Sequence, residues 1–558
     1  MNKKSRNTII GSIVVAMLAV IAAVVVSGIS FWNSSVDSEA AGRPVKIDSV
    51  TIVGSDVVAQ ISCSSIPSSD DGVFYLYGNE VYEDGATGKV VATTKTAKSA
   101  TLTFPLNLNS EDSNLSRKFL VVVKQGGNLV QVSDEHYITN PEAVATYTSI
   151  RNDHGIKGLL ADLEMEDVYE LSELGLQQVI YNFDLGTVCG LTDDPAYPTI
   201  EYTYDGTTYY FNGHTVTSYD TLISQWNNMG LQVTMVILNS DDVQSPYTAD
   251  LMHPDSRDGH ECPGYAFNTA EEGGTKHLKA IAAFLGERYS GMTGHGQVDN
   301  WCIGNEVNAR TEWYYLQSDD LDTNVNAYVK AFRIFYNGIK SMNGSANIYN
   351  SIDQEWNRKS NPGCFLSKAY LDTFNYYMNR EGNINWGLSF HPYNSPLFDP
   401  YAWKGQSQYV SRNIKTPYIT MQNIDVLIDY MHQADFLAPD GSVRSISLAE
   451  QGYTSSFGED YQSASLVYSY LMAASYPDID AFLLFRQTDN AHEMESNLAL
   501  GLNNLDGTHK PAYYFYQAMG AANQQEYIDK ASNIIGMDVQ YLVDNRILLT
   551  RSGWSLND

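Results

Sequence analysis

The chain has 558 residues, which exceeds one ordinary hydrophobic core, so we expect two or more domains. Hydrophobic residues make up 43% and charged residues 18%, a composition typical of folded proteins that excludes disorder throughout the chain. The formal net charge of −31 argues against nucleic acid or anionic membrane surfaces as partners, because their phosphates would be repelled. It suits a soluble extracellular protein that acts on neutral or cationic material.

Residues 1–40 have the pattern of an export segment. Three basic residues among the first six precede a run over 9–29 that has no charged residue. At about 1.5 Å per residue this run is long enough to cross a bilayer, and the preceding positive charges hold the N-terminus in the cytoplasm. A membrane anchor and a cleaved signal peptide both fit. We therefore expect an exported protein, anchored at the cell surface or secreted, that meets the membrane through this segment only if it stays uncleaved.

Residues 41–143 carry seven short runs that are rich in Val, Ile, Tyr and Thr. Gly, Asn, Asp and Ser separate the runs, and no helical stretch lies between them. This pattern predicts a small antiparallel β-sandwich of immunoglobulin or fibronectin type. Its role stays open between a spacer, a carbohydrate-binding module and a packing partner for the next domain.

From residue 147 to 530 strand and helix patterns alternate, which indicates a mostly parallel sheet. Eight such units predict a (β/α)₈ TIM barrel, an α/β fold, with long loops on its catalytic rim. The strands are expected at 155–161, 177–185, 232–240, 298–306, 347–356, 385–393, 445–453 and 481–490. A Tyr-rich insert at 199–216 with Asp-Gly at its centre predicts a hairpin. The last helix is expected at 511–528, and 531–558 form a C-terminal extension.

The cysteines give little structural information. They are five, an odd number without CxxC spacing, so no disulfide framework is implied. Cys302 lies in a predicted strand and is expected to be a small buried hydrophobe. Cys189 and Cys262 fall in loops on the same predicted rim, which leaves a pairing open. The spacing of His253, His260 and Cys262 matches no common metal site, and no metal or organic cofactor is expected.

Two glutamates stand at the ends of apolar runs, Glu306 in VDNWCIGNEVN and Glu450 in SISLAEQGY. A single glutamate after a strand is ordinarily a solvated loop residue, but a matched pair on barrel strands shares one rim. Two carboxyl groups are what glycosidic-bond cleavage requires. The other polar or aromatic candidates at predicted strand ends are Asn182, Asn305, Trp356, His391, Tyr393 and Arg486.

Three of these segments resemble the clan A glycoside hydrolases: IGNE on the fourth strand, HPY on the sixth and LAEQGY on the seventh. The tail GLNNLDGTHKPAYYFYQAM resembles the segment that begins the last helix of that family. The resemblance covers roughly residues 150–525 and is closest to a poorly characterised bacterial branch, so it implies no particular substrate. Phe485-Arg486 replaces the tryptophan often found on the eighth strand. The arginine usual on the second strand has no direct counterpart, with Arg151 and Arg486 as candidate substitutes.

The resemblance implies that Glu306 is the general acid/base and Glu450 the nucleophile of a retaining mechanism, with carboxyl groups about 5–5.5 Å apart. Asn305 would bind the sugar 2-hydroxyl, Tyr393 would donate to Glu450, and His391 would bind the sugar or orient a carboxylate. Trp356 would offer a flat face to the ring. The expected substrate-binding residues are Asn305, His391, Tyr393, Trp356, Asn182 and Arg486.

We therefore expect a retaining glycoside hydrolase that cleaves O-glycosidic bonds in an extracellular poly- or oligosaccharide by double displacement. The alternative is a non-catalytic cell-surface carbohydrate-binding protein on a barrel scaffold, although both glutamate positions are filled. A third interpretation is a structural or adhesion protein. A separation of more than about 10 Å between the carboxyl groups of the two glutamates would favour it. The sequence leaves the sugar, the linkage, endo or exo action and the oligomeric state open.

Overall fold

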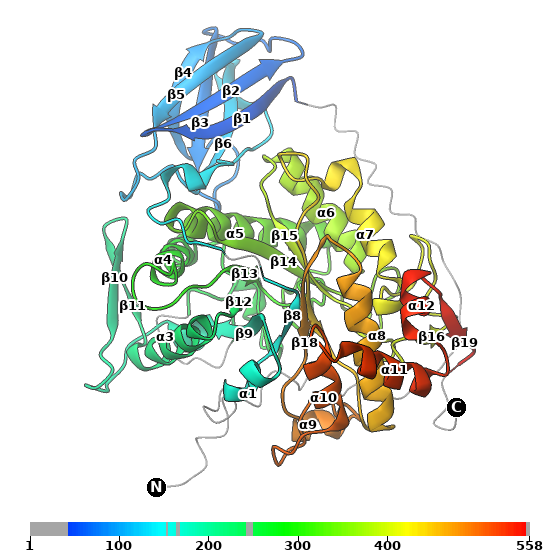
Figure 1. The fold of residues 1–558 in the computed structure, drawn as a ribbon. Coiled ribbons are helices and arrows are strands. Elements are labelled where there is room, and N and C mark those ends of the chain that lie inside the picture. The colour runs from blue at the N-terminus through cyan, green and yellow to red at the C-terminus, as the bar shows by residue number, and fades with distance from the viewer. Residues whose placement is uncertain (1–42, 152–153, 163–167, 241–248, 554–558) are drawn as a thin grey trace.

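The structure is a computed structural model that describes residues 43–151, 154–162, 168–240 and 249–553. The described chain folds into a small β domain and a larger barrel (Figure 1). The export segment predicted at 1–40 lies outside the described residues. Within them, no helix combines the length and the apolar character that a membrane crossing needs.

The small domain is the predicted antiparallel sandwich. Its strands, within the described residues, form one sheet in the order β1-β2-β5 and another in the order β4-β3-β6-β7. They are β1 (Val45–Val53), β2 (Asp56–Cys63), β3 (Val73–Asn79), β4 (Lys89–Lys95), β5 (Ser99–Pro105), β6 (Lys118–Gln125) and β7 (Asn128–Gln131). Alternate residues of facing strands, such as Val50, Val57 and Phe74, are fully buried and form a core between the sheets.

The large domain is a closed parallel barrel, as predicted, and the described residues supply its eight strands in the order β12-β13-β14-β15-β17-β18-β8-β9. The strands are β8 (Lys157–Leu160), β9 (Gln178–Asp184), β12 (Gln232–Leu238), β13 (Asn300–Ile303), β14 (Asn347–Asp353), β15 (Gly387–His391), β17 (Ile446–Gln451) and β18 (Ile479–Leu484). Each overlaps a predicted strand. Side chains from several strands fill the lumen below the rim, among them Ile180, Val236 and Cys302, so the barrel is a packed core rather than a pore.

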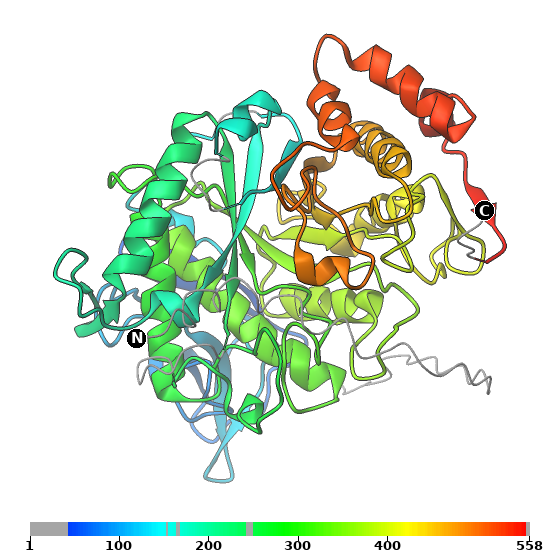
Figure 2. The same cartoon turned by 90° about the horizontal axis from the view of Figure 1, so that it is seen from below.

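Helices surround the barrel (Figure 2). They are α1 (Val168–Glu173), α3 (Gly213–Asn228), α4 (Glu272–Arg288), α5 (Leu321–Met342), α6 (Ser367–Arg380), α7 (Asp425–Met431), α8 (Glu459–Ala474) and α10 (Pro511–Ala518). In α5, Asp320 caps the first turn by accepting from the Thr323 amide. Val325, Val329 and Phe332 then recur at helical spacing and are fully buried.

The insert after β9 is the predicted hairpin, made of β10 (Ile200–Tyr204) and β11 (Thr207–Phe211). Asp205 and Gly206 at its tip have φ values of +48° and +83°. A two-residue turn of type I′ requires the left-handed region at both positions, which explains the Asp-Gly pair.

One prediction about the fold is wrong, and one pairing that the sequence left open is not formed. The last helix, expected as one element over 511–528, is divided into α10 and α11 (Gln524–Ile535), because Gly520 between them adopts a φ of +77° that favours a helix end. Cys189 is a free thiol, so the pairing with Cys262 is not formed. The two cysteines belong to different apolar clusters, Cys189 to the main core and Cys262 to a small one with Tyr265.

The C-terminal residues continue along the barrel wall. After α11, α12 (Val539–Asp544) packs against both α8 and α11 (Figure 2). A short strand, β19 (Leu549–Arg551), then pairs in parallel with β16 (Lys404–Gln406). This pairing attaches the end of the chain to the loop that follows β15.

The sandwich packs on the outer side of α4, α5 and the end of α6 (Figure 1). Glu80, just after β3, accepts from Arg117 Nη2 at 3.0 Å within the sandwich and forms a second ion pair with Lys279 on α4. The side chains of Glu80, Arg117 and Lys279 are only 17%, 5% and 10% exposed. A single carboxylate therefore neutralises two nearly buried cations where the domains meet.

Substituting Glu80→Gln is expected to lower the free energy of unfolding by about 2–3 kcal/mol, because both cations lose their partner in a desolvated position. Urea unfolding followed by circular dichroism measures this loss. The control is Asp112→Asn, whose ion pair with Lys89 is more than half exposed on both sides, so its loss should leave the stability almost unchanged. Equal losses for the two variants would contradict the prediction.

Candidate active site

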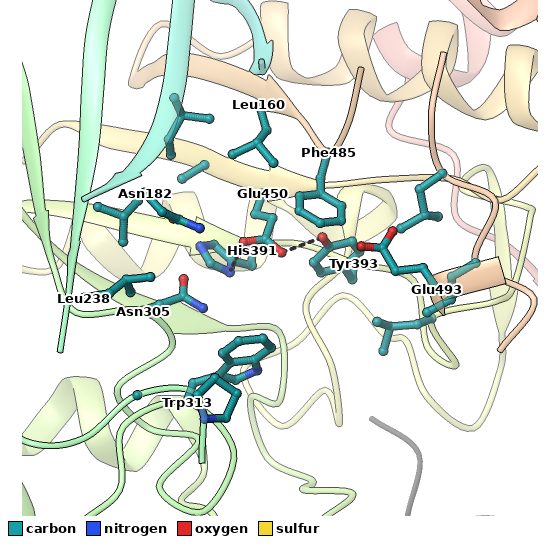
Figure 3. Close-up of a pocket in the computed structure, with 18 residues that line it drawn as sticks. Leu160, Asn182, Leu238, Asn305, Trp313, His391, Tyr393, Glu450, Phe485 and Glu493 are labelled. Atoms are coloured by element: carbon teal, nitrogen blue, oxygen red, sulfur yellow. Dashed lines mark hydrogen bonds and ion pairs between the residues drawn. The ribbon is translucent and has the colours of Figure 1, made fainter. Parts of the chain in front are cut away.

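A cleft opens at the carboxyl ends of the barrel strands (Figure 3). Its walls come from the ends of β8, β9, β12, β15 and β17 and from the loops after β13 and β18. The lining residues are Leu160, Ile180, Asn182, Val236, Leu238, Pro263, Gly264, Asn305, Trp313, His391, Tyr393, Leu397, Ala449, Glu450, Phe485, Glu493, Leu498 and Leu500. Most of them are apolar, so the few polar groups act in surroundings of low dielectric constant, where charges interact strongly.

Glu306 follows β13 in a tight and strained turn. Gly304 has a φ of +79°, and a Cβ there would lie 2.8 Å from the Val307 side chain. Glu306 itself has a φ of +40°, in the left-handed region that costs a non-glycine residue on the order of 1 kcal/mol. The Ser351 hydroxyl on β14 accepts from the Glu306 amide at 3.3 Å and holds the turn. Strain that neighbours enforce at a polar residue is typical of functional sites.

One imidazole joins the two glutamates. Nδ1 of His391 lies 2.8 Å from Glu306 Oε1 and 3.7 Å from Glu450 Oε2. These two oxygens are therefore no farther apart than the sum of the two distances. Glu306 is 8% exposed and does not line the cleft. It contacts His391 and follows Asn305 in the chain, and both of those residues line the cleft. The geometry excludes the separation of more than about 10 Å that an incidental barrel would favour.

His391 is buried and is suited to partner either glutamate. Burial lowers its pKa, against the opposing charges of Glu450 and Asp353, so the neutral imidazole prevails near pH 7. Its second nitrogen, Nε2, lies 3.4 Å from the Ser351 hydroxyl. A neutral imidazole donates from one nitrogen and accepts at the other. Nδ1 therefore accepts from a protonated Glu306 in one tautomer and donates to a carboxylate in the other.

The two glutamates differ in their surroundings. Burial raises the pKa of Glu306 well above its usual value, and the nearby charges of Asp353 and Glu312 raise it further. Burial also raises the pKa of Glu450, as do the charges of Glu306 and Glu493, and His391 and a hydrogen bond from Tyr393 offset part of that rise. The Tyr393 hydroxyl donates to Glu450 Oε1 at 2.7 Å (Figure 3), the contact expected from the sequence. Glu306 thus holds its proton while Glu450 is supported as a carboxylate.

The structure brings most of the predicted site residues together. Asn182, Asn305, His391, Tyr393 and Glu450 all line the cleft. Asn182 comes from β9, and its side chain lies across the cleft from Tyr393 (Figure 3). Among the described residues, no group of three or more His, Cys, Asp and Glu side chains is arranged to hold a metal ion.

Trp356 is not in the cleft, contrary to the prediction. It is fully buried, its indole N–H donates to the Ile414 carbonyl at 3.2 Å, and its ring packs edge-on against Tyr430. The residue comes three positions after the end of β14, where the chain has already turned into the packing behind the rim. The tryptophan that lines the cleft is Trp313, in the loop after β13.

The predicted arginines also lie outside the cleft. Arg486 follows Phe485 across a cis peptide bond, and Phe485 lines the cleft while Arg486 does not. Arg486 instead donates to Glu493 at 3.0 Å and lies 3.8 Å from Asp162. Arg151 donates to the Asn300 side chain, at the amino end of β13 and so at the far end of the barrel. Neither residue takes the place of a substrate-binding arginine.

Glu493 is the one acidic lining residue that the sequence patterns do not predict. It lies on α9 (Ala491–Met494), after the loop that follows β18. No strand pattern leads to it, because its position depends on how that loop folds back over the barrel. Its closeness to Arg486 in the chain is the sequence signal that could have indicated this acid.

Solved structures similar to this chain include several glycoside hydrolases. A family 39 glycoside hydrolase from the gut symbiont Bacteroides cellulosilyticus WH2 is 14% identical with a TM-score of 0.44, covering 86% of this chain and 83% of its own. A Bacteroides uniformis β-glucuronidase is 11% identical with a TM-score of 0.38, covering 85% of this chain and 51% of its own. A glucosidase from Croceicoccus marinus is 13% identical with a TM-score of 0.39, covering 69% and 70%. No curated protein matches the chain.

A shared architecture does not fix an activity, so the function rests on the residues of this chain's own site. Residues 149–541, more than half of the chain, match a family of unknown function designated DUF5722. The match contains every barrel strand described above and both glutamates of the cleft. The chain therefore belongs to the family of unknown function DUF5722.

Proposed function

We propose that this protein is a retaining glycoside hydrolase that cleaves O-glycosidic bonds in an extracellular poly- or oligosaccharide. Glu450 is the nucleophile and Glu306 the general acid/base. The proposal rests on one observation, the His391 ring nitrogen that lies 2.8 Å from one glutamate and 3.7 Å from the other. The sum of these two distances is an upper limit on the separation of the two oxygens. The separation of about 5–5.5 Å in retaining enzymes lies below this limit, and only the lower end of the inverting range, about 6.5–9.5 Å, meets it.

In the first step the Glu450 carboxylate attacks the anomeric carbon, and the Glu306 proton passes to the leaving oxygen. A covalent glycosyl–enzyme and a free alcohol result. In the second step Glu306, now ionised, takes a proton from water as the water displaces Glu450. With its hydrogen on Nδ1, neutral His391 donates to Glu306 Oε1 in both stages, so the Glu306 proton, carried on the other oxygen, stays free for the leaving group.

Around this pair, Asn305 is placed to bind the sugar 2-hydroxyl, and Trp313 and Phe485 offer flat apolar faces to a ring. We further propose that the protein works outside the cell, either secreted or anchored at the surface. The charge-free run over 9–29 behind a basic N-terminus supports this location.

Substituting Glu450→Gln is expected to lower kcat by about 10⁴-fold or more on any glycoside that the parent hydrolyses, because no nucleophile remains. Substituting Glu306→Gln should lower the rate by roughly 10²–10⁴-fold for alkyl glycosides, whose leaving group needs a proton. The loss should be much smaller for 2,4-dinitrophenyl glycosides, and added azide should speed the second step. Steady-state rates on the two substrate types measure the difference.

The matched control for these variants is Glu495→Gln, whose side chain is 70% exposed and should leave all rates unchanged. Circular dichroism verifies that each variant folds. Full activity of Glu450→Gln, or equal losses of Glu306→Gln on both leaving groups, would refute the assigned roles.

Substituting Tyr393→Phe is expected to move the acidic limb of the kcat/KM profile to higher pH. The Tyr393 hydrogen bond lowers the pKa of Glu450. Without it that pKa rises, so the nucleophile is protonated at a pH where the parent is still active. We expect kcat to fall about tenfold at the parent optimum, with the basic limb little changed. An acidic limb that stays in place would contradict the role of the hydroxyl.

Substituting Asp353→Asn is expected to move the opposite limb. Burial raises the pKa of Glu306 most, and the Asp353 charge raises it further. Removing that charge lowers the Glu306 pKa, so the acid loses its proton sooner as the pH increases and the basic limb moves to lower pH. The amide oxygen can still accept from Ser367, which preserves the local fold. A basic limb that moves to higher pH would contradict this reasoning, and Glu495→Gln should move neither limb.

A further inference from the structure

Glu493 carries a buried oxygen that faces the cleft. Its side chain is 2% exposed and points toward the same space as Glu450 and Tyr393 (Figure 3). Oε1 accepts from Arg486 Nη1 at 3.0 Å. Oε2 is buried and has no hydrogen-bond partner among the described residues. One oxygen of this carboxylate is thus held by protein, and the other has no protein partner among the described residues although the residue lines the cleft.

An oxygen in this position needs a hydrogen-bond donor. Burying a polar group without a partner costs about 1–3 kcal/mol, and more where charge is involved. Native proteins rarely leave such atoms unpaired unless function requires it. A sugar hydroxyl that enters the cleft supplies the missing donor, and a hydrogen bond to a carboxylate is stronger than one between neutral groups.

The cleft offers no counterpart for a negative charge. None of the described lining residues is a lysine or arginine. Arg486, the cation nearest to Glu493, already pairs with Glu493 at 3.0 Å and approaches Asp162 at 3.8 Å. The barrel segments outside the described residues, 152–153, 163–167 and 241–248, contain no lysine or arginine in their sequence either. A carboxylate on the substrate would therefore meet Glu450 and Glu493 without a cation to neutralise it.

The opposite wall makes such a charge more costly still. Leu160, Ile180, Val236 and Leu238, from the ends of β8, β9 and β12, present only hydrocarbon to the cleft. Hydrocarbon cannot solvate an ion, but it packs against the C–H face of a sugar ring. An ammonium group would also be desolvated there, and the ion pair with Arg486 leaves Glu493 less charge to attract it.

We infer that Glu493 binds a hydroxyl group of an uncharged sugar through Oε2, and that the cleft selects neutral glycosides against uronic acids. The inference rests on the proposed function for the location of the sugar, and it adds a residue and a substrate class to that site. Glu493 is a specificity-determining residue in this scheme, and Arg486 positions it.

The first test compares the full-length protein on matched nitrophenyl glycosides. The panel contains both anomers of glucosides, galactosides, mannosides and xylosides, with glucuronides, galacturonides and free-amine glucosaminides as charged counterparts. We expect kcat/KM to be at least 100-fold lower for each uronide than for its neutral counterpart, and lower for the glucosaminide. A preference for a charged glycoside would overturn the inference.

The second test uses Glu493→Gln on the best neutral substrate and on its monodeoxy analogues. The Gln variant keeps an acceptor for Arg486 but loses the carboxylate, so kcat/KM should fall roughly 10–100-fold. One deoxy analogue should lose a similar factor in the parent and lose nothing further in the variant. A merely structural Glu493 would lower all analogues equally. Glu495→Gln, two residues away and exposed, should change nothing.

Calorimetric binding to Glu450→Gln separates this inference from the proposed function. We expect neutral glycosides to bind the Glu450→Gln variant and to bind the double variant Glu450→Gln/Glu493→Gln more than tenfold more weakly. This result supports the role of Glu493 even if the parent hydrolyses none of them and the proposed function fails. Hydrolysis that Glu493→Gln leaves unchanged overturns the inference and keeps the proposed function. A protein that neither binds nor hydrolyses any glycoside of the panel overturns both.

Discussion

Two carboxyl groups share one buried imidazole at the rim of this barrel, and the rest of the site is arranged around that contact. Two acids this close in an apolar cleft do not both ionise at low cost, because their charges repel strongly where the dielectric constant is low. The neighbours decide which one keeps its proton. Asp353 and Glu312 add negative charge beside Glu306, whereas Tyr393 and His391 stabilise negative charge on Glu450. The difference in pKa between the two glutamates is therefore set by the residues that surround them.

The hydrogen bonds between the barrel strands hold these surrounding residues in place. Asp353 on β14 pairs in register with His391 on β15, and Ser351, two residues earlier on β14, contacts both the His391 ring and the Glu306 amide. A shift of one residue between β14 and β15 would turn these side chains to the opposite faces of the sheet. The same ladder that closes the barrel thus sets the distances between Glu306, Ser351 and His391. Fold and site are specified by one set of backbone contacts.

This explains which parts of the site the sequence could predict. Glu306, His391 and Glu450 stand at the ends of strands whose apolar pattern is clear, and parallel strands bring their carboxyl ends to one rim. Trp356 lies as far past β14 as Glu306 lies past β13, but its prediction is wrong because the chain after β14 turns its side chain into the packing against Tyr430, which strand alternation does not determine. The partners of Arg486 and the position of Glu493 depend on how the loop after β18 folds, which no periodicity encodes. Strand-borne chemistry is readable from local pattern, and loop-borne chemistry is not.

In the proposed glycoside hydrolase, charge would act on substrate choice at two distances. The whole chain carries a formal charge of −31, which slows the approach of anionic polymers from solution. Salt screens this long-range effect over roughly 8 Å at physiological ionic strength. The carboxylates of Glu450 and Glu493 act inside a largely apolar cleft, where screening by salt is much weaker. At high ionic strength the long-range repulsion therefore fades while the local repulsion remains, so discrimination between neutral and anionic glycosides must come from the cleft itself.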